Sequence, residues 1–319
     1  MELSVVVATR NDPEVFDALE SVMEQDYYDY EIIVVDGSDG GHQEDLETFC
    51  SDNDAITYLH ESERDEPVDG LNGARNFGVA NASGEGVALL DADCVATDGW
   101  LESFVEALEE DDIVECTVTY DGEGKNCPMD RVIQNDGKEY RFLGAGLAFR
   151  RAVWEETKFD ERFHQLRNDT AFGFDALDNE FSYAFCEDAE VLHRAGRFSP
   201  LQFVKERLRF VYEPLFYGEY RKHDHFDDNV DHLGPLLYPK ELLYLAALFA
   251  SAVLPFAAAT VPLLMGAGEL VYLQREGEKR ALDVCPRDLV LLFFLVPLAL
   301  VAKRLAIWRG AVTYRTPVL

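Results

Sequence analysis

Two aspartates stand two residues apart at the end of an apolar run. Residues 87–90 are apolar, and Asp91 and Asp93 follow them directly. Such a run predicts a buried strand, and ligands of an open α/β sheet gather just beyond the carboxyl ends of its strands. Two carboxylates there suit Mg²⁺ or Mn²⁺ carrying a phosphorylated ligand. In so acidic a chain an isolated Asp-x-Asp can equally be an ordinary acidic loop, so the elements around it decide.

Two further apolar runs place polar side chains in an equivalent position. Residues 4–8 and 31–35 predict strands, and Thr9 and Asp36 come directly after them. Because the carboxyl ends of parallel strands meet at one edge of a sheet, we expect these side chains to join the aspartate pair there.

Helical segments separate the predicted strands. Asp12 can cap a helix that has Pro13 at its first position, and a second helix is predicted from Gly70 to residues 82–84. Alternating strands and helices predict a parallel sheet with right-handed crossovers.

The order and spacing of these segments resemble the family 2 glycosyltransferases, which have the nucleotide-sugar-binding fold called GT-A. The matching segments are residues 6–11, 33–38, 73–78, 90–93, 144–151, 159–163 and 168–170. The resemblance covers roughly the first 200 residues. It implies an α/β fold class, a GT-A doubly wound sheet, which we expect to be followed by a C-terminal α-helical membrane region.

The resemblance implies a set of residues that bind the nucleotide sugar. Asp36 would hydrogen-bond the base, although an aspartate after a strand can also merely cap the next turn. Thr9 and Arg10 would line the base and ribose region. Arg75 would contact the diphosphate or the base, since its forked donors suit phosphate, unless it is a solvated helix arginine.

The same resemblance assigns the metal ligands. Asp93 would bind Mg²⁺ or Mn²⁺ directly, and Asp91 would contact ribose or metal-bound water. The cation would neutralise the departing diphosphate. Residues 191–193 predict a late strand whose His193 would reach the metal or the diphosphate, with a purely structural histidine as the alternative.

One carboxylate suffices as base if the acceptor attacks directly and the anomeric configuration inverts. Asp169 matches the position of the family's base, although Asn168 stands where the family usually has Glu. The neighbouring acids Glu187 and Asp188 are competing candidates.

The composition restricts the setting of this chemistry. The chain of 319 residues has 61 acidic and 28 basic residues, a net charge of −33, which favours a surface adapted to high salt. Nucleic acid is not an expected partner, because phosphate binding needs a basic face. Six cysteines without a Cys-x-x-Cys pair argue against a zinc site and a disulfide framework. The first residues predict no signal peptide.

The carboxyl-terminal part of the chain is much more apolar. Residues 242–268 contain no charge and are long enough to cross a bilayer as a helix. Residues 289–302 form a second run, which Lys303 and Arg304 can extend to Trp308 by snorkelling. A buried pair of helices in a soluble domain is the alternative. Basic residues on either side of the second run are equal in number, so they do not fix the orientation.

Residues 200–220 interleave apolar and basic side chains and predict an amphipathic helix at a membrane surface or on the catalytic domain. The expected organisation is therefore a catalytic domain over 1–199, an interfacial segment and linker over 200–235, and two transmembrane helices within 236–319.

These features together predict a membrane-anchored inverting glycosyltransferase. It would move a sugar from a UDP- or GDP-sugar to a lipid-linked acceptor of the dolichol-phosphate type, and it resembles archaeal transferases that build surface-layer glycoprotein glycans. Because nucleotide sugars are cytosolic, the catalytic domain would face the cytoplasm from the cell membrane. One alternative is a non-catalytic membrane scaffold. Another is a nucleotidyltransferase, although the segment after the first strand lacks the Gly-rich phosphate loop of that class.

Overall fold

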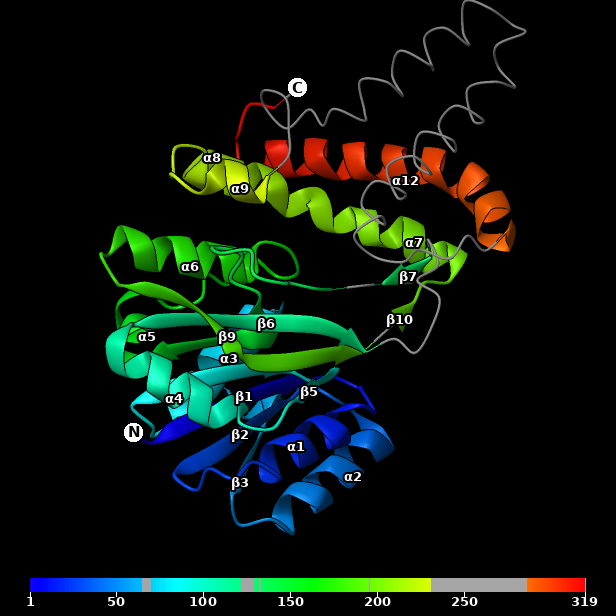
Figure 1. Ribbon diagram of the computed structural model, residues 1–319. Helices are drawn as coiled ribbons and strands as arrows, with labels where there is room; N and C mark the ends of the chain where they lie inside the picture. The colour runs from blue at the N-terminus through cyan, green and yellow to red at the C-terminus, as the bar shows by residue number, and fades with distance from the viewer. Residues whose placement is uncertain (65–69, 122–128, 132, 195, 231–285, 319) are drawn as a thin grey trace, which may run out of the picture. The chain divides into compact units, whose positions relative to one another are not determined.

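The computed structural model describes residues 1–64, 70–121, 129–131, 133–194, 196–230 and 286–318 (Figure 1). Two compact units divide the chain. The first comprises residues 1–121 and 133–194, and the second comprises residues 122–132 and 195–319. The first unit ends at residue 194, five residues before the domain boundary expected at residue 199. Residues 122–132 lie between its two segments in the sequence but belong to the second unit.

An eight-stranded sheet forms the centre of the first unit, in the order β3-β2-β1-β4-β8-β6-β9-β5. The strands are β1 (Leu3–Thr9), β2 (Tyr30–Asp36), β3 (Ile56–His60), β4 (Gly86–Asp91), β5 (Cys94–Ala96), β6 (Ile113–Asp121), β8 (Leu147–Arg150) and β9 (Tyr183–Arg194). The strand predictions at 4–8, 31–35, 87–90 and 191–193 are confirmed. β3 gave no clear sequence signal, because this edge strand buries none of its side chains fully.

The sheet is mixed rather than wholly parallel. β3, β2, β1 and β4 are parallel, as predicted, whereas β8 runs antiparallel to β4 and β6, and β5 runs antiparallel to β9. A parallel neighbour needs a crossover of about a dozen residues or more. Only Ala92 and Asp93 separate β4 from β5, so β5 cannot return parallel to β4.

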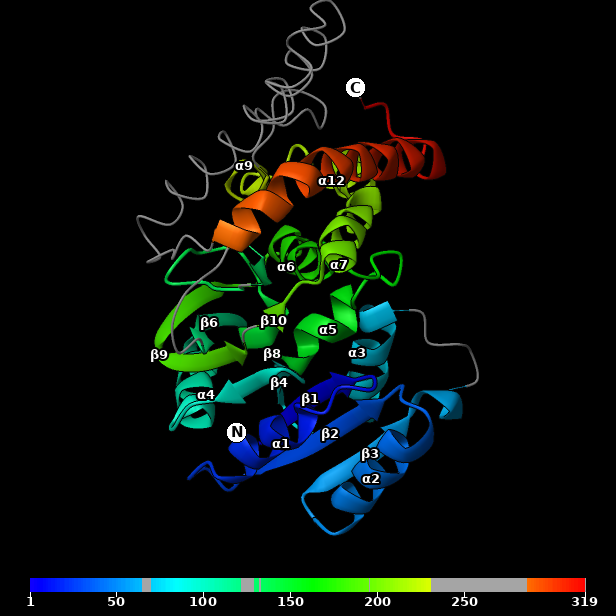
Figure 2. The same ribbon diagram turned by 90° about the vertical axis from the view of Figure 1, so that its right-hand side faces the viewer.

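Helices cover both faces of the sheet. They are α1 (Val15–Met23), α2 (Gly40–Ser51), α3 (Gly70–Asn81), α4 (Trp100–Glu110), α5 (Arg151–Thr157) and α6 (Asn168–Asp178), with short 3₁₀ turns η1 (Glu61–Glu63) and η2 (Gly144–Gly146). α3 and α5 lie side by side (Figures 1 and 2). There Trp154 Nε1 donates a hydrogen bond to Asn76 Oδ1 at 2.9 Å.

The predicted start of the first helix is wrong by two residues. α1 begins at Val15 rather than Pro13, because Asp12 Oδ1 accepts the Glu14 N–H at 3.0 Å and closes a turn before the helix. The helix predicted from Gly70 is confirmed as α3 and ends at Asn81.

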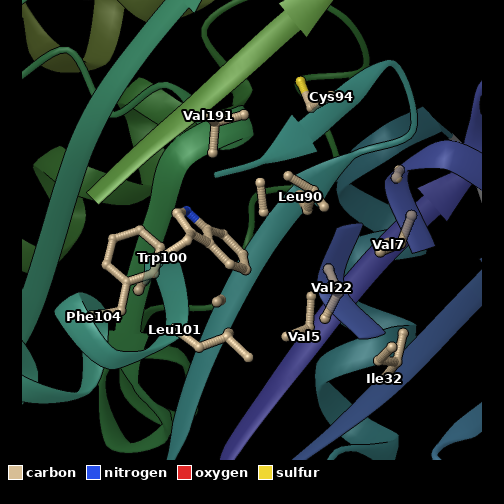
Figure 3. Packing of buried hydrophobic residues seen from close by; sticks show 14 of the residues in the cluster. Val5, Val7, Val22, Ile32, Leu90, Cys94, Trp100, Leu101, Phe104 and Val191 are labelled. Atoms are coloured by element: carbon tan, nitrogen blue, oxygen red, sulfur yellow. The ribbon is translucent and has the colours of Figure 1, made fainter. Parts of the chain in front are cut away.

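The apolar core fixes the strands that carry the polar edge. Trp100 and Leu101 of α4 pack with Val5, Leu90 and Val191 from β1, β4 and β9 (Figure 3). Fully burying a large apolar side chain contributes roughly 1.5–3 kcal/mol, so these contacts hold the strand ends in register.

The second unit is mainly helical. It contains the paired strands β7 (Asp130–Arg131) and β10 (Gly196–Arg197), and the helices α7 (Pro200–Lys205), η3 (Glu206–Tyr212), α8 (Glu213–Tyr220), α9 (Phe226–Asn229) and α12 (Pro286–Thr313). Ser199 and Gln202 form a capping box that begins α7. Residues 200–220 are therefore helical as predicted, but in three consecutive pieces.

The predicted membrane segments have different outcomes. Residues 242–268 lie outside the described residues, and residues 289–302 belong to α12. Of the helices the structure describes, none combines the length and the apolar character needed to cross a membrane. The structure therefore does not support the second transmembrane helix that the sequence predicted. Val296, Ala299 and Ile307 of α12 are instead buried within the second unit.

A candidate active site at the carboxyl ends of the strands

The strand register brings the predicted polar residues to one edge of the sheet. Thr9 is opposite Asp36 across β1 and β2, and Ala8 is opposite Asp91 across β1 and β4. Pairing of β5 with β9 sets Cys94 opposite His193, which places Asp93 next to the histidine. Parallel pairing of β1, β2 and β4 therefore brings Thr9, Asp36 and Asp91 together, and antiparallel pairing of β5 with β9 adds Asp93 and His193.

Asp36 ends β2 with both of its carboxylate oxygens engaged. Oδ1 accepts the Ser38 N–H at 2.8 Å and Oδ2 accepts the Tyr58 hydroxyl at 2.8 Å. Burial raises the pKa of Tyr58 strongly, and the bond to Asp36 adds to the shift. These contacts are the ones expected if Asp36 only caps the turn that follows β2. Each oxygen has a further lone pair, so recognition of a base stays a prediction.

Thr9 and Arg10 follow β1 and differ in exposure. Thr9 Oγ1 is buried and makes no hydrogen bond among the residues the structure describes. Arg10 is 58% exposed and forms an ion pair with Glu61. A Cβ added to Gly37 would lie 2.6 Å from Arg10 Nε and from the Glu61 carboxylate, so a side chain there would displace this ion pair.

Arg75 of α3 is buried, and the solvated-arginine alternative is wrong. Its side chain is 3% exposed, and Nη2 donates to Asp91 Oδ1 at 3.1 Å. Its guanidinium carbon lies 5.8 Å from the centre of the Phe159 ring. Nη1 is also buried but has no hydrogen-bond partner in the described part of the chain. A buried, unsatisfied guanidinium N–H is a ready donor for an anionic ligand.

Asp93, Cys94 and His193 form a group that could hold a metal ion. One potential ligand atom from each lies within 4.8 Å of the others, and His193 Nε2 is 3.5 Å from Asp93 Oδ1. His193 Nδ1 lies 3.1 Å from the Arg194 carbonyl oxygen, which favours the tautomer with hydrogen on Nδ1.

The buried Nε2 of His193 provides a test of whether these residues fit a cation. This atom makes no hydrogen bond within the described residues, so a ligand position is open on it. Carboxylate and imidazole together suit a divalent cation of borderline character such as Mn²⁺. Cys94 is the third member of this group. Its thiol does belong to the apolar core, yet its sulfur is also within reach of the other two groups.

Asp169 lies in the first turn of α6 and faces the loop that precedes β8. Oδ2 accepts the Gly144 N–H at 2.9 Å, and Oδ1 accepts the Thr170 N–H at 2.8 Å. The charges of Arg141 and Asp169 interact, and burial and the neighbouring Arg167 lower the pKa of Arg141. An aspartate held in this way could serve as a general base.

The competing acids Glu187 and Asp188 are exposed in a bulge of β9. The pairing of β6 with β9 shifts at Cys116, which displaces these residues from the regular strand. They precede His193 by six and five residues, roughly 15–20 Å along a regular strand. The geometry favours Asp169, because Gly144 connects it to Arg75: the Gly144 N–H donates to Asp169, and a Cβ on Gly144 would overlap the Arg75 guanidinium.

The sequence analysis missed one residue of this region, Glu115 of β6. Its side chain is fully buried, and Tyr183 Oη donates to its Oε2 at 2.9 Å. A single acidic residue within the apolar start of a strand, between Val114 and Cys116, is the signal that could have identified it.

The comparisons with known proteins agree with this geometry. The sequence profile "Glycosyl transferase family 2" matches residues 4–176, more than half of the chain. A GalNAc(5)-diNAcBac-PP-undecaprenol β-1,3-glucosyltransferase of Campylobacter jejuni is 29% identical over 177 residues, which cover 51% of this chain and 56% of that protein. The glycosyltransferase AglE of Haloferax volcanii is 34% identical over 110 residues, 33% of this chain and 35% of AglE. The chain thus matches only part of the length of these relatives.

A solved structure shares the fold. GalNAc-T7, crystallised with UDP, GalNAc and Mn²⁺, superposes with a TM-score of 0.52 at 17% identity, over 72% of this chain and 50% of that one. The family match, the GT-A-like α/β sheet and the polar edge together lead to one conclusion: this chain belongs to glycosyl transferase family 2.

Proposed function

We propose that the protein is an inverting, metal-dependent transferase that moves a sugar from a UDP- or GDP-sugar to a lipid-linked acceptor. The observation that carries this proposal is a set of three buried polar atoms without hydrogen-bond partners among the described residues: Thr9 Oγ1, Arg75 Nη1 and His193 Nε2. Thr9 ends β1, Arg75 of α3 pairs with Asp91 at the end of β4, and His193 of β9 lies 3.5 Å from Asp93. Buried donors and acceptors are normally satisfied, so such a cluster indicates a polar ligand.

The donor would bind along this edge. Thr9, Arg10 and Asp36 would contact the base and ribose, and the buried Arg75 would offer Nη1 to the diphosphate while Nη2 holds Asp91. Asp93 and His193 would hold a Mg²⁺ or Mn²⁺ ion, with Cys94 in reach. A cation bound there would supply the positive charge that stabilises the departing diphosphate.

Asp169 would act as the base. Its carboxylate takes the proton of the acceptor hydroxyl as that oxygen forms a bond to the anomeric carbon, and the bond from this carbon to the diphosphate oxygen breaks. A single direct displacement of this kind inverts the anomeric configuration. The N–H groups of Gly144 and Thr170 fix the orientation of the carboxylate before the acceptor arrives.

A lipid-linked acceptor, which we propose to be of the dolichol-phosphate type, is supported by the Campylobacter jejuni relative, whose name gives a substrate linked to undecaprenol diphosphate. The likeness to AglE from Haloferax volcanii and the net charge of −33 support a halophilic archaeon and assembly of surface glycoprotein glycans. These assignments rest on similarity and composition.

Attachment to the cell membrane, with the catalytic unit facing the cytoplasm, belongs to the same proposal. The uncharged run 242–268 supports it, and so does an apolar stripe on α12. The exposed members of this stripe are Leu298, Val301, Leu305, Trp308 and Val312. Residues 289–319 contain no acidic side chain, although the whole chain is strongly acidic. A basic, apolar helix suits the surface of an anionic bilayer.

The test is a panel of UDP- and GDP-sugars offered to the full chain with short-chain polyprenyl phosphate and polyprenyl-diphosphate-sugar acceptors. We expect release of a nucleoside diphosphate and a product whose anomeric configuration is opposite to that of the donor, as read by NMR. Retained configuration would contradict the inverting mechanism. Release of inorganic diphosphate would favour a nucleotidyltransferase, and donor binding without turnover would favour a scaffold.

A further inference from the structure

We propose that Glu115 is a positioning residue that fixes the loop of residues 140–146 beneath the active site. Glu115 lies on β6 and touches none of the residues assigned to the donor, the metal or the base. Its carboxylate instead lies under the segment that leads into η2, and that segment contacts both halves of the site.

Successive backbone N–H groups of the loop converge on this carboxylate. Oε2 accepts the Arg141 N–H at 3.1 Å, Oε1 accepts the Leu143 N–H at 3.3 Å, and the Phe142 N–H also bonds to it. Tyr140 and Phe142 have φ values of 61° and 51°, in the left-handed region. A left-handed residue among ordinary ones turns neighbouring N–H groups to the same side, which is the geometry of a backbone anion nest.

Two side chains complete the enclosure of the Glu115 carboxylate. Asn135 Nδ2 donates to Oε1 at 2.9 Å, and its Oδ1 accepts the Lys138 N–H at 2.9 Å. The Tyr183 hydroxyl donates to Oε2 and accepts the Tyr140 N–H at 2.9 Å, while the rings of Tyr183 and Tyr140 stack at 4.4 Å. The carboxylate is therefore the common acceptor for the backbone and the side chains that set the loop's path.

The loop transmits this order to the active site through Gly144. Its N–H is the donor to Asp169 Oδ2, and its Cα packs so closely on Arg75 that a Cβ would overlap the guanidinium. Thr170 Oγ1 also donates to the Arg141 carbonyl at 3.4 Å. One segment therefore sets the orientation of the proposed base and limits the position of the arginine that holds Asp91.

A purely structural role would explain the contacts of Glu115 but not its charge. Burial raises the pKa of Glu115 even though three backbone N–H groups and Tyr183 oppose the shift. Each of the hydrogen bonds to its two oxygens comes from a donor, which suits the ionised carboxylate, although a neutral side chain is often the more stable occupant of a buried position. An anion is, however, the group that can gather several N–H donors at once.

The experiment compares Glu115→Gln with Glu31→Gln. Glu31 is a matched control, because its carboxylate holds Ser4 Oγ at 2.7 Å and Ser83 Oγ at 2.8 Å at the opposite, amino-terminal edge of the same sheet. We expect kcat for transfer to fall about 30- to 100-fold in Glu115→Gln, since a small misplacement of reacting groups can cost roughly 100-fold. KM for the nucleotide sugar should stay within about threefold, because Arg75 keeps its own ion pair with Asp91. Glu31→Gln should leave both parameters within about twofold.

Amide hydrogen exchange gives a readout that does not depend on activity. The amides of residues 141–144 should lose protection in Glu115→Gln and keep it in Glu31→Gln. Equal kcat in the two variants, or unchanged protection of these amides, would overturn the proposal. If Glu115→Gln does not fold, Tyr183→Phe with Tyr27→Phe as its control replaces the pair. We then expect a fall of about three- to tenfold in kcat for Tyr183→Phe alone, and equal rates would refute the role.

The expected effect on kcat rests on the proposed role of Asp169 as the base. The role of Asp169 and the role of Glu115 can be tested separately. Normal transfer by Asp169→Asn would remove the base assignment. The exchange contrast between Glu115→Gln and Glu31→Gln would still decide whether Glu115 orders the loop.

Discussion

Replacing Asp169 by Asn tests the central chemical assignment with the least change in shape. The carboxylate now accepts two N–H donors, from Gly144 and from Thr170. An asparagine offers one oxygen and one NH₂ group, so it can keep one of these bonds while the other donor meets a second donor. The variant also loses a negative charge at the amino terminus of α6.

The structural cost and the chemical cost differ enough to be measured apart. Losing one hydrogen bond lowers the free energy of unfolding by about 1 kcal/mol, and the lost charge at the helix terminus adds roughly 0.3–1 kcal/mol. Removing a general base lowers the rate by about 10²- to 10⁴-fold, or roughly 3–5 kcal/mol in the activation barrier. We therefore expect a folded variant that transfers almost no sugar.

The assay pairs transfer kinetics with donor binding and urea denaturation. Asp169→Asn should bind the nucleotide sugar as the wild type does, because none of its contacts involves Thr9, Asp36 or Arg75. Asp188→Asn is the control, and it should transfer normally. If Asp169→Asn retains more than a tenth of the wild-type rate while Asp188→Asn is inactive, the base assignment is wrong. The base would then be Asp188, in the bulge of β9.

Three further predictions concern groups that are buried at a cost. Thr9→Val removes a buried hydroxyl that lacks a partner among the described residues, so the free energy of unfolding should rise by up to about 1 kcal/mol while KM for the donor increases. Denaturation and kinetics on one preparation check both, and a lower stability would refute the reasoning. His193→Ala should weaken Mn²⁺ binding, measured by electron paramagnetic resonance, by at least about tenfold, and excess chelator should stop transfer by the wild type. Unchanged Mn²⁺ affinity would remove this ligand. The pKa of Glu115 is higher in the folded protein than in the unfolded chain, so the folded state binds its proton more tightly. The free energy of unfolding of the wild type, relative to that of Glu115→Gln, should therefore decrease as pH rises from 4.5 through the pKa of the folded state. Denaturation at several pH values measures this difference, and an increase with pH would contradict the assigned direction.

Local sequence patterns predicted the half of the fold that builds the donor side. β1, β2 and β4 are continuous apolar runs, and such runs predict parallel strands buried on both faces. Once these strands pair in parallel, the positions of Thr9, Asp36 and Asp91 follow from the register alone. The resemblance to a family supplied the roles, but the placement needs only periodicity and connection length.

The acceptor side could not be predicted in this way, because it depends on contacts between distant segments. Nothing local to Glu115 indicates that it meets Arg141 and Tyr183, which lie 26 and 68 residues away. The hydrogen bond from Gly144 to Asp169 was equally hard to predict. The loop before Gly144 contains two left-handed residues, Tyr140 and Phe142, and neither is a glycine that would indicate such a conformation in the sequence. The reversed direction of β8 has the same origin, since pairing with β4 and β6 on both sides sets its orientation.

Three of the buried polar atoms that lack hydrogen-bond partners among the described residues lie at the candidate site, whereas others, such as Trp100 Nε1 and Asn229 Oδ1, lie elsewhere. A core that were selected for stability alone would not leave Thr9 Oγ1, Arg75 Nη1 and His193 Nε2 buried without partners, because each such group costs about 1–3 kcal/mol. Three of them together amount to a large share of the 5–15 kcal/mol by which a typical domain is stable. A ligand that satisfies these groups recovers that free energy on binding. At the polar edge these atoms support the donor and metal sites proposed above, and the buried Glu115 carboxyl reflects the same compromise between stability and function.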